Sequence, residues 1–189
     1  MTSRWSIRPE NATWGDWGPD DQLGRLNLIN ADKVKQGLAE AVTGNTFCLS
    51  LPLDYPGGQV INKVRHPPVL KPVMRNGEDY FNYRWDKLNP CHTDIGSDDL
   101  VVLYTQYSTQ WDSLAHRGSQ FDTQGDGTLR PVYYNGFAAD EHVVRRASGE
   151  SYAHALGIEH MAYHGVQGRG VLVDLHTRFG DFLCSGGFK

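Results

Sequence analysis

The chain has 189 residues, and its 18 basic and 22 acidic side chains give a net charge of −4. Apolar residues make up 39% and charged residues 21%, which is typical of a folded globular protein and not of a disordered one. The acidic balance, without a basic stripe, argues against a nucleic-acid partner. No apolar run approaches the roughly 18 residues that a membrane-spanning helix needs, so no membrane partner is expected.

Cysteine usage and the N-terminus point to the cytoplasm. The chain opens on polar sequence without a signal-peptide pattern. Its three cysteines, Cys48, Cys91 and Cys184, lack the spacing of a metal site and are too few for a disulfide framework. We therefore expect reduced thiols. The 21 glycines indicate many turns and short strands and argue against an all-helical bundle.

The first elements follow an aromatic, acidic, glycine-rich arm over residues 1–29. A helix is predicted next, capped by Asn30 or Asp32 and stopped by Gly44. Residues 47–53 alternate apolar with smaller or polar side chains, and this period of two predicts a strand with one buried face. Pro52 makes that strand an edge or ends it early.

The second half combines two apolar segments with a helix. Residues 54–99 hold five of the nine prolines and predict a long irregular region with one short strand. Residues 100–104 predict a buried strand that runs into the polar stretch 105–116. A helix is expected from Ser148 or Ser151 to about residue 164, and a second buried strand over 170–175. Together these elements predict a single domain of the α/β or α+β class over residues 1–189.

Asp112 and His116 form the most suggestive acid–base pair. Four positions apart on a helical turn, they would lie on one face, where a carboxylate can orient an imidazole or hold a metal beside a general base. A surface ion pair or a helix-capping aspartate is the alternative from spacing alone.

Two further patterns are weaker. His160 and His164 have the spacing of a zinc pair, but no glutamate follows the first histidine and no third ligand is evident, so an exposed or core histidine pair is the alternative. The glycine-rich residues 165–170 precede a predicted strand instead of following one and lack G-x-G-x-x-G, which argues against dinucleotide binding.

Three segments in order resemble one family. Residues 14–29 open with Trp-Gly-Asp-Trp-Gly-Pro, residues 108–116 are followed by Tyr-Asn-Gly at 134–136, and residues 165–175 form the third. Together they resemble the longer branch of the cyclase-like metal-dependent hydrolases, the kynurenine formamidase and isatin hydrolase type. The resemblance implies a swivelling β/β/α domain, incomplete at the C-terminus, because family members of this branch continue well beyond the third segment. The last residues, 181–189, match nothing expected of the family.

The resemblance also implies the site. The family signature H-x-G-T-H-x-D-x-P-x-H places its two metal-binding histidines on Gln106 and Gln110, its metal-binding aspartate on Asp112 and its acid–base histidine on His116. The longer branch carries Thr-Gln-Trp-Asp here, as this chain does. The resemblance implies a divalent metal cofactor, Mn²⁺ or Zn²⁺, with Mg²⁺ as a further option. Because glutamine oxygens are poorer zinc ligands than imidazoles, the two replacements favour the harder ions.

The function implied is hydrolysis of an aryl formamide or cyclic amide, with water activated by a metal and His116 as the acid–base group. Trp111, with Trp14 and Trp17 of the arm, would wall an aromatic substrate, or would simply pack. The expected partners are such a small substrate and further copies of the chain in a homo-oligomer. One alternative is a catalytically inactive relative or fragment that binds ligands, motivated by the two replaced histidines and the early end of the chain. Another is a metal-free hydrolase that uses Asp112 and His116 alone and is insensitive to chelator.

Overall fold

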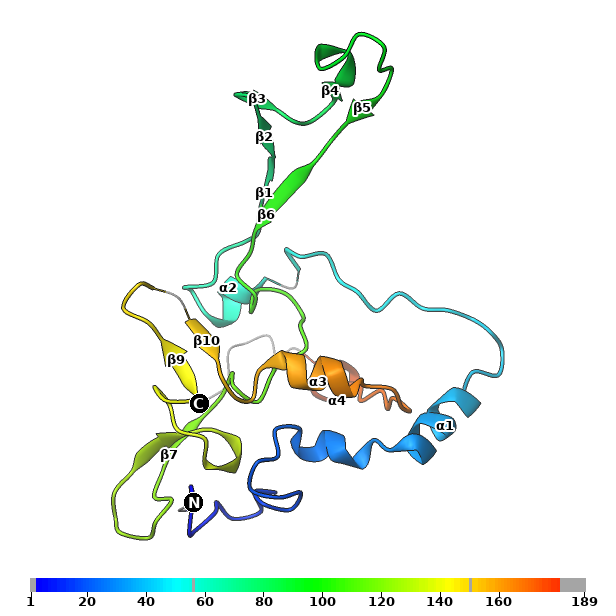
Figure 1. The fold of residues 1–189 in the computed structure, drawn as a ribbon. Helices are drawn as coiled ribbons and strands as arrows, with labels where there is room; N and C mark the ends of the chain where they lie inside the picture. Colours follow the sequence, from blue (N-terminus) through cyan, green and yellow to red (C-terminus); the bar gives the residue numbers. More distant parts are fainter. Residues whose placement is uncertain (1–2, 56, 150, 181–189) are drawn as a thin grey trace. The chain divides into compact units, whose positions relative to one another are not determined.

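The computed structural model describes residues 3–55, 57–149 and 151–180 (Figure 1). The chain divides into two compact units, residues 1–45 with 112–189 and residues 46–111, and each is described by itself. The single domain over 1–189 with an arm over 1–29 stays a prediction. No helix in the described ranges is both long and apolar enough to cross a bilayer.

The first unit contains short helices and two antiparallel strand pairs, β7 with β8 and β9 with β10. Its elements are η1 (Gly24–Leu28), α1 (Ala31–Ala39), β7 (Ser119–Phe121), β8 (Arg130–Val132), η3 (Tyr134–Gly136), β9 (Val143–Arg145), β10 (Ser151–Ala153), α3 (Ile158–His164) and α4 (Leu175–Phe179). Its core is formed by Phe137, Ala155 and Leu156, against which four half-buried side chains pack: Leu114, Ala115, Tyr133 and Tyr134.

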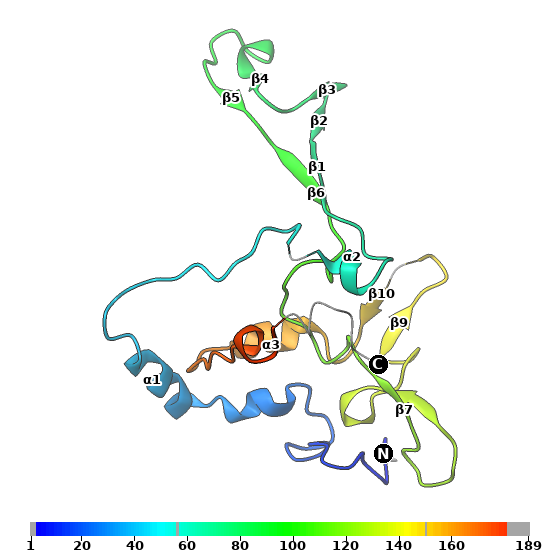
Figure 2. The same ribbon diagram turned by 180° about the vertical axis from the view of Figure 1, so that it is seen from behind.

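Helix α1 begins where the sequence predicts. The side chain of Asn30 accepts hydrogen bonds from the backbone N–H groups of Asp32 and Lys33, which would otherwise lack partners in the first turn. The helix ends at Ala39, before the predicted stop at Gly44. It lies beside the segment after α3, where a Cβ on Gly37 would meet the backbone of Gly168 at 2.5 Å (Figure 2). Only glycine permits that approach.

The second unit is built on a ladder of two antiparallel strands, β1 with β6, in which Val69 faces Val102. Two smaller pairs, β2 with β3 and β4 with β5, follow it (Figure 1). The bounds are α2 (Gly58–Ile61), β1 (Val69–Pro72), β2 (Met74–Arg75), β3 (Glu78–Asp79), β4 (Tyr83–Arg84), η2 (Trp85–Lys87), β5 (Ile95–Gly96) and β6 (Asp99–Val102). The region 54–99 is therefore more regular than predicted.

Several predicted elements are wrong in this structure. The strand expected over 100–104 is present as β6, but its residues are exposed and not buried. Residues 47–53 and 170–174 are described throughout and include no strand, although both carry apolar strand patterns. A strand requires a hydrogen-bonded neighbour, and neither segment pairs within the described part of the chain. The helix expected from Ser148 or Ser151 begins only at Ile158, because residues 151–153 pair as β10.

The mixed α/β class is confirmed, with small antiparallel sheets and few helices. Cys48 and Cys91 are free thiols, as expected, whereas Cys184 and the segment 181–189 lie outside the described residues.

Candidate active site

The Asp112–His116 pair predicted from spacing is present. Nδ1 of His116 lies 2.8 Å from Oδ2 of Asp112, and the side chains are 26% and 41% exposed, respectively. The expected helical turn is absent, since residues 111–113 have no regular secondary structure and 114–116 form a turn closed by a hydrogen bond from His116 N–H to the carbonyl of Ser113. The contact is therefore made by a bend in a loop.

This contact fixes the chemistry of the imidazole. An ionised carboxylate only accepts hydrogen bonds, so in neutral His116 this contact favours the tautomer with its proton on Nδ1, which donates a hydrogen bond to Asp112. The other ring nitrogen, Nε2, then has a lone pair that can take a proton from water. An aspartate that orients a histidine in this way is suited to general acid–base chemistry at a partly exposed site.

The turn is anchored to the core of its unit by its central residues. Leu114 and Ala115 pack against the buried cluster of Phe137, Ala155 and Leu156. The N–H of Ala115 also donates a hydrogen bond to the carbonyl of Leu156 at 3.2 Å. His116 thus follows directly on a residue held by both apolar packing and a backbone hydrogen bond.

Gln106, Gln110 and Trp111 belong to the second unit. The side-chain amide of Gln110 donates to Oε1 of Gln106 at 2.6 Å. Arg65 donates from Nη1 to the backbone carbonyl of Gln106 at 3.0 Å. The indole of Trp111 is 62% exposed. The two glutamines predicted as ligands therefore lie in contact with each other, and their role as ligands stays a prediction.

The predicted donors test which metal would fit. Gln106, Gln110 and Asp112 offer oxygen atoms only, and oxygen donors favour Mn²⁺ or Mg²⁺ over Zn²⁺. Within residues 3–55, 57–149 and 151–180 no three His, Cys, Asp or Glu side chains gather as a metal-binding group. Such oxygen donors would suit a hard cation better than a nitrogen- or sulfur-rich zinc centre would, and the metal itself stays a prediction.

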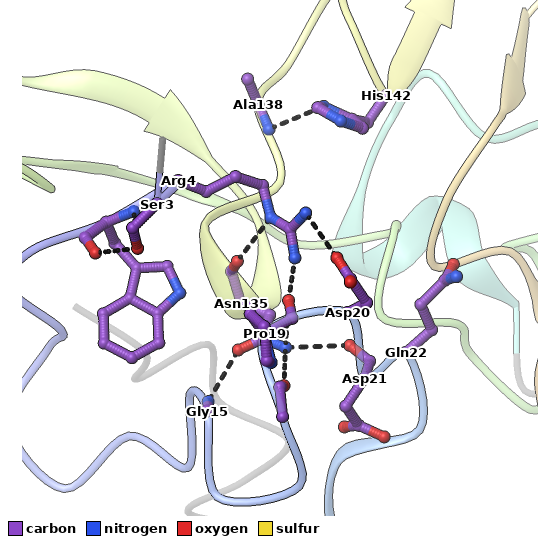
Figure 3. A network of polar contacts seen from close by, with 12 residues as sticks. Ser3, Arg4, Gly15, Pro19, Asp20, Asp21, Gln22, Asn135, Ala138 and His142 are labelled. Carbon is purple, nitrogen blue, oxygen red and sulfur yellow. Dashed lines mark hydrogen bonds and ion pairs between the residues drawn. The ribbon is translucent and has the colours of Figure 1, made fainter. Parts of the chain in front are cut away.

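The N-terminal arm is held to this unit by the buried side chain of Asn135 (Figure 3). Its Oδ1 accepts from the N–H of Gly15 at 2.8 Å. Its Nδ2 lies within 3.1 Å of three arm carbonyls, those of Gly18, Pro19 and Asp21. Tyr-Asn-Gly at 134–136 contributes only to the family resemblance, and no local sequence pattern predicts this role for Asn135.

Neighbouring groups complete the contact with the arm. The Tyr134 hydroxyl donates to Oδ2 of Asp21 at 2.8 Å, and burial together with that carboxylate raises its pKa above the ordinary 10.0. Arg4 pairs with Asp20 at 3.0 Å (Figure 3). Its guanidinium also lies 4.0 Å from the centre of the Phe137 ring. These contacts make the arm an integral part of the first unit.

The arm tryptophan Trp14 packs in the interior, which is the alternative to lining a substrate site. Its ring is 6% exposed and lies against Trp5 and Phe121, with centroids 6.1 and 5.9 Å away. It is therefore part of the packed interior of the unit, whereas Trp17 is half-buried. Of the three predicted tryptophans, Trp111 has the most exposed ring.

The histidine pair of α3 lines a separate pocket. Its volume is about 640 Å³, and both His160 and His164 contribute to its wall along with Gln22 and Tyr163. Nδ1 of His164 contacts the carbonyl of Gly165 at 2.7 Å, and Nε2 of His160 lies 3.6 Å from Glu159. These contacts favour a structurally satisfied pair, in which His164 is exposed and His160 is half-buried.

Comparison with known proteins supports the fold. A solved structure described as the crystal structure of a novel cyclase has 28% sequence identity to this chain and a TM-score of 0.54. The match covers 78% of this chain and 43% of that one, so the chain spans less than half of the cyclase's length. No protein-family model and no curated protein matches the chain.

Proposed function

From the mixed α/β fold that this chain shares with a solved cyclase, we infer that its chemistry takes place at the hydrogen-bonded pair of Asp112 and His116 in its first unit. We propose that the protein is an enzyme that hydrolyses an amide or cyclic amide of the arylformamidase type, with His116 as the acid–base group. The observation that carries this proposal is the 2.8 Å contact of His116 with Asp112.

In the proposed reaction, Nε2 of His116 takes a proton from a water molecule as the water oxygen attacks the amide carbonyl carbon. The C–N bond then breaks, and His116 returns the proton to the leaving nitrogen, so that the products are a carboxylic acid and an amine. Asp112 holds the ring in the tautomer with its proton on Nδ1 and stabilises the cation formed between the two steps.

A divalent metal is part of the proposal. When bound, such an ion polarises a carbonyl and makes a bound water more acidic. Asp112 is the proposed carboxylate ligand, and the family resemblance implies Gln106 and Gln110 as its companions. The all-oxygen donor set supports Mn²⁺ or Mg²⁺ before Zn²⁺.

The proposed substrate is a small aromatic amide or lactam. The 62% exposed Trp111 offers a flat apolar surface one residue before Asp112, and such surfaces suit aryl groups. Trp111→Ala should raise KM for aryl substrates by about tenfold, since loss of one aromatic contact costs about 0.5–1.5 kcal/mol in addition to the buried area.

The test is hydrolysis of an aryl formamide and of isatin by the full chain, after treatment with chelator and after addition of Mn²⁺, Mg²⁺ or Zn²⁺. We expect turnover that returns with Mn²⁺ and is abolished in His116→Gln. His160→Gln is the matched control, because that histidine lines a pocket to which neither Asp112 nor His116 contributes. Full turnover by His116→Gln, or none by the wild-type chain with any of the metals, would overturn the proposal.

A second candidate is a binding protein without turnover. It is favoured by the hydrogen bond that the Gln110 side chain donates to Gln106, since these two amides stand where the family signature has histidines. This reading predicts saturable binding of an aromatic amide, measured calorimetrically, with no product under any metal condition.

A further inference from the structure

A chain of hydrogen bonds connects the N-terminal arm to the catalytic turn. The side-chain Oε1 of Gln22 accepts from the backbone N–H of Leu156 at 2.7 Å. The carbonyl of the same Leu156 accepts from the N–H of Ala115 at 3.2 Å, and His116 is the next residue. One residue of the core thus joins Gln22 to the turn that carries the acid–base pair.

Leu156 has an unusual backbone for this role. Its φ of +66° lies in the left-handed region, which leucine adopts rarely, and its side chain is completely buried. Such a conformation persists only where the surroundings determine it. At Leu156 the determinants are the core packing of its side chain and the two hydrogen bonds of its peptide groups.

From these contacts we infer that Gln22 is a positioning residue for His116, acting through Leu156 and Ala115. This inference rests on the proposed function of His116. Loss of the Gln22 acceptor leaves a buried N–H without its partner and lets Leu156 relax from the left-handed region. The carbonyl that holds Ala115 then shifts, and the imidazole loses its fixed position beside Asp112.

Gln22→Met tests the inference, since methionine keeps the length of the side chain and removes the oxygen. We expect amide exchange of Ala115 to become about fivefold faster, which corresponds to loss of one ordinary hydrogen bond. We also expect ¹⁵N spectra of the labelled imidazole to show a mixture of tautomers where the wild type has its proton on Nδ1. In turnover, kcat should fall about tenfold with KM nearly unchanged.

Two further variants control the experiment. Gln22→Glu keeps an oxygen acceptor and should restore the wild-type tautomer. Gln124→Met removes the same amide group from a glutamine that bonds Ser6 and Arg4 of the arm and makes no hydrogen bond to Leu156. This variant should change neither the ¹⁵N spectrum of the imidazole nor kcat. An equal effect of both methionine variants would reduce Gln22 to an ordinary contact of the arm.

The outcomes separate this inference from the proposed function. Exchange and tautomer measurements need no substrate, so they remain decisive if the chain hydrolyses nothing. Fast exchange of the Leu156 and Ala115 amides in the wild-type protein would overturn the inference even if Gln22→Met failed to fold. An unchanged imidazole spectrum in a folded Gln22→Met protein would overturn it as well.

Discussion

Asn135 and Gly15 lie 120 positions apart in the chain, yet the amide oxygen of Asn135 accepts the N–H of Gly15 at 2.8 Å. The Asn135 side chain is fully buried, and its φ of +58° lies in the left-handed region, which asparagine tolerates better than most residues. Asn135 therefore has two roles. Its side chain bonds backbone groups in the turns of the arm, and its own backbone adopts the left-handed conformation that η3 contains. The arm is not an appendage of the first unit but a part of its packing.

Asn135→Ala should lower the free energy of unfolding by about 2–4 kcal/mol, because it removes four part-buried hydrogen bonds to the arm and places alanine at a positive φ that alanine rarely adopts. Urea unfolding measures the change. Asn82→Ala is the matched control, since Asn82 also has a positive φ of 53° but an exposed side chain, and we expect a cost of about 1 kcal/mol or less there. Equal losses in the two variants would show that the hydrogen bonds of Asn135 contribute nothing.

Tyr134 makes the same contact sensitive to alkaline pH. A raised pKa in the folded state means that the neutral hydroxyl adds stability below the ordinary pKa of 10.0, and that this contribution is lost as pH rises through the raised folded value. Wild-type protein should therefore lose more unfolding free energy between pH 8 and pH 11 than Tyr134→Phe. Tyr163→Phe, at a ring that is 96% exposed, should behave like the wild type in urea unfolding at both pH values.

The loop after β7 has the opposite dependence. Burial acts to raise the pKa of Asp122, but backbone N–H donors from residues 124–127 outweigh it and hold the pKa below its usual value. The carboxylate thus stabilises the loop above the unfolded pKa of 3.8, and the effect is lost as pH falls through the lower folded value. Amide exchange of Gly125 and Gly127 should stay slow at pH 5 and accelerate only in stronger acid. Asp122→Asn should exchange faster at pH 5, and an unchanged rate there would contradict the assignment.

The parts of the fold that were predictable depend on contacts between residues close together in the sequence. The cap at Asn30 acts on the N–H groups two and three positions ahead, so sequence alone locates the start of α1. Asn76 and Gly77 both have positive φ in the turn between β2 and β3, and Asn-Gly is a strong hairpin signal that the sequence reading missed. Alternation over 47–53 indicates a strand but identifies no partner strand for it, and this is why the predicted strand is absent from the structure.

The site shows the same division. The i, i+4 spacing of Asp112 and His116 predicted their contact, even though a turn and not a helix brings them together. The sequence pattern predicts Leu156 inside a helix, whereas in the structure its N–H bonds to Gln22, which lies 134 positions earlier. A left-handed backbone fixed by so distant a contact leaves no local signal in the sequence. The residues that support the site were therefore predictable only from the fold.

Asp112→Asn tests the chemical core of the proposal. Asparagine has nearly the same shape but no charge, so it can neither hold the Nδ1 proton of His116 as firmly nor stabilise the imidazolium, and it is a weaker metal ligand. We expect kcat on an aryl formamide to fall by about 10²–10⁴-fold, and Mn²⁺ affinity measured by calorimetry to fall with it. Asp16→Asn is the matched control for this prediction. The Asp16 side chain has the same 41% exposure as that of Asp112, and it pairs with the cationic group of Arg8 at 2.5 Å. Because exposed ion pairs contribute about 0–1 kcal/mol to stability, Asp16→Asn should keep both turnover and metal affinity. Retained turnover in Asp112→Asn would remove the aspartate from the mechanism, and an equal loss in Asp16→Asn would assign the effect to net charge.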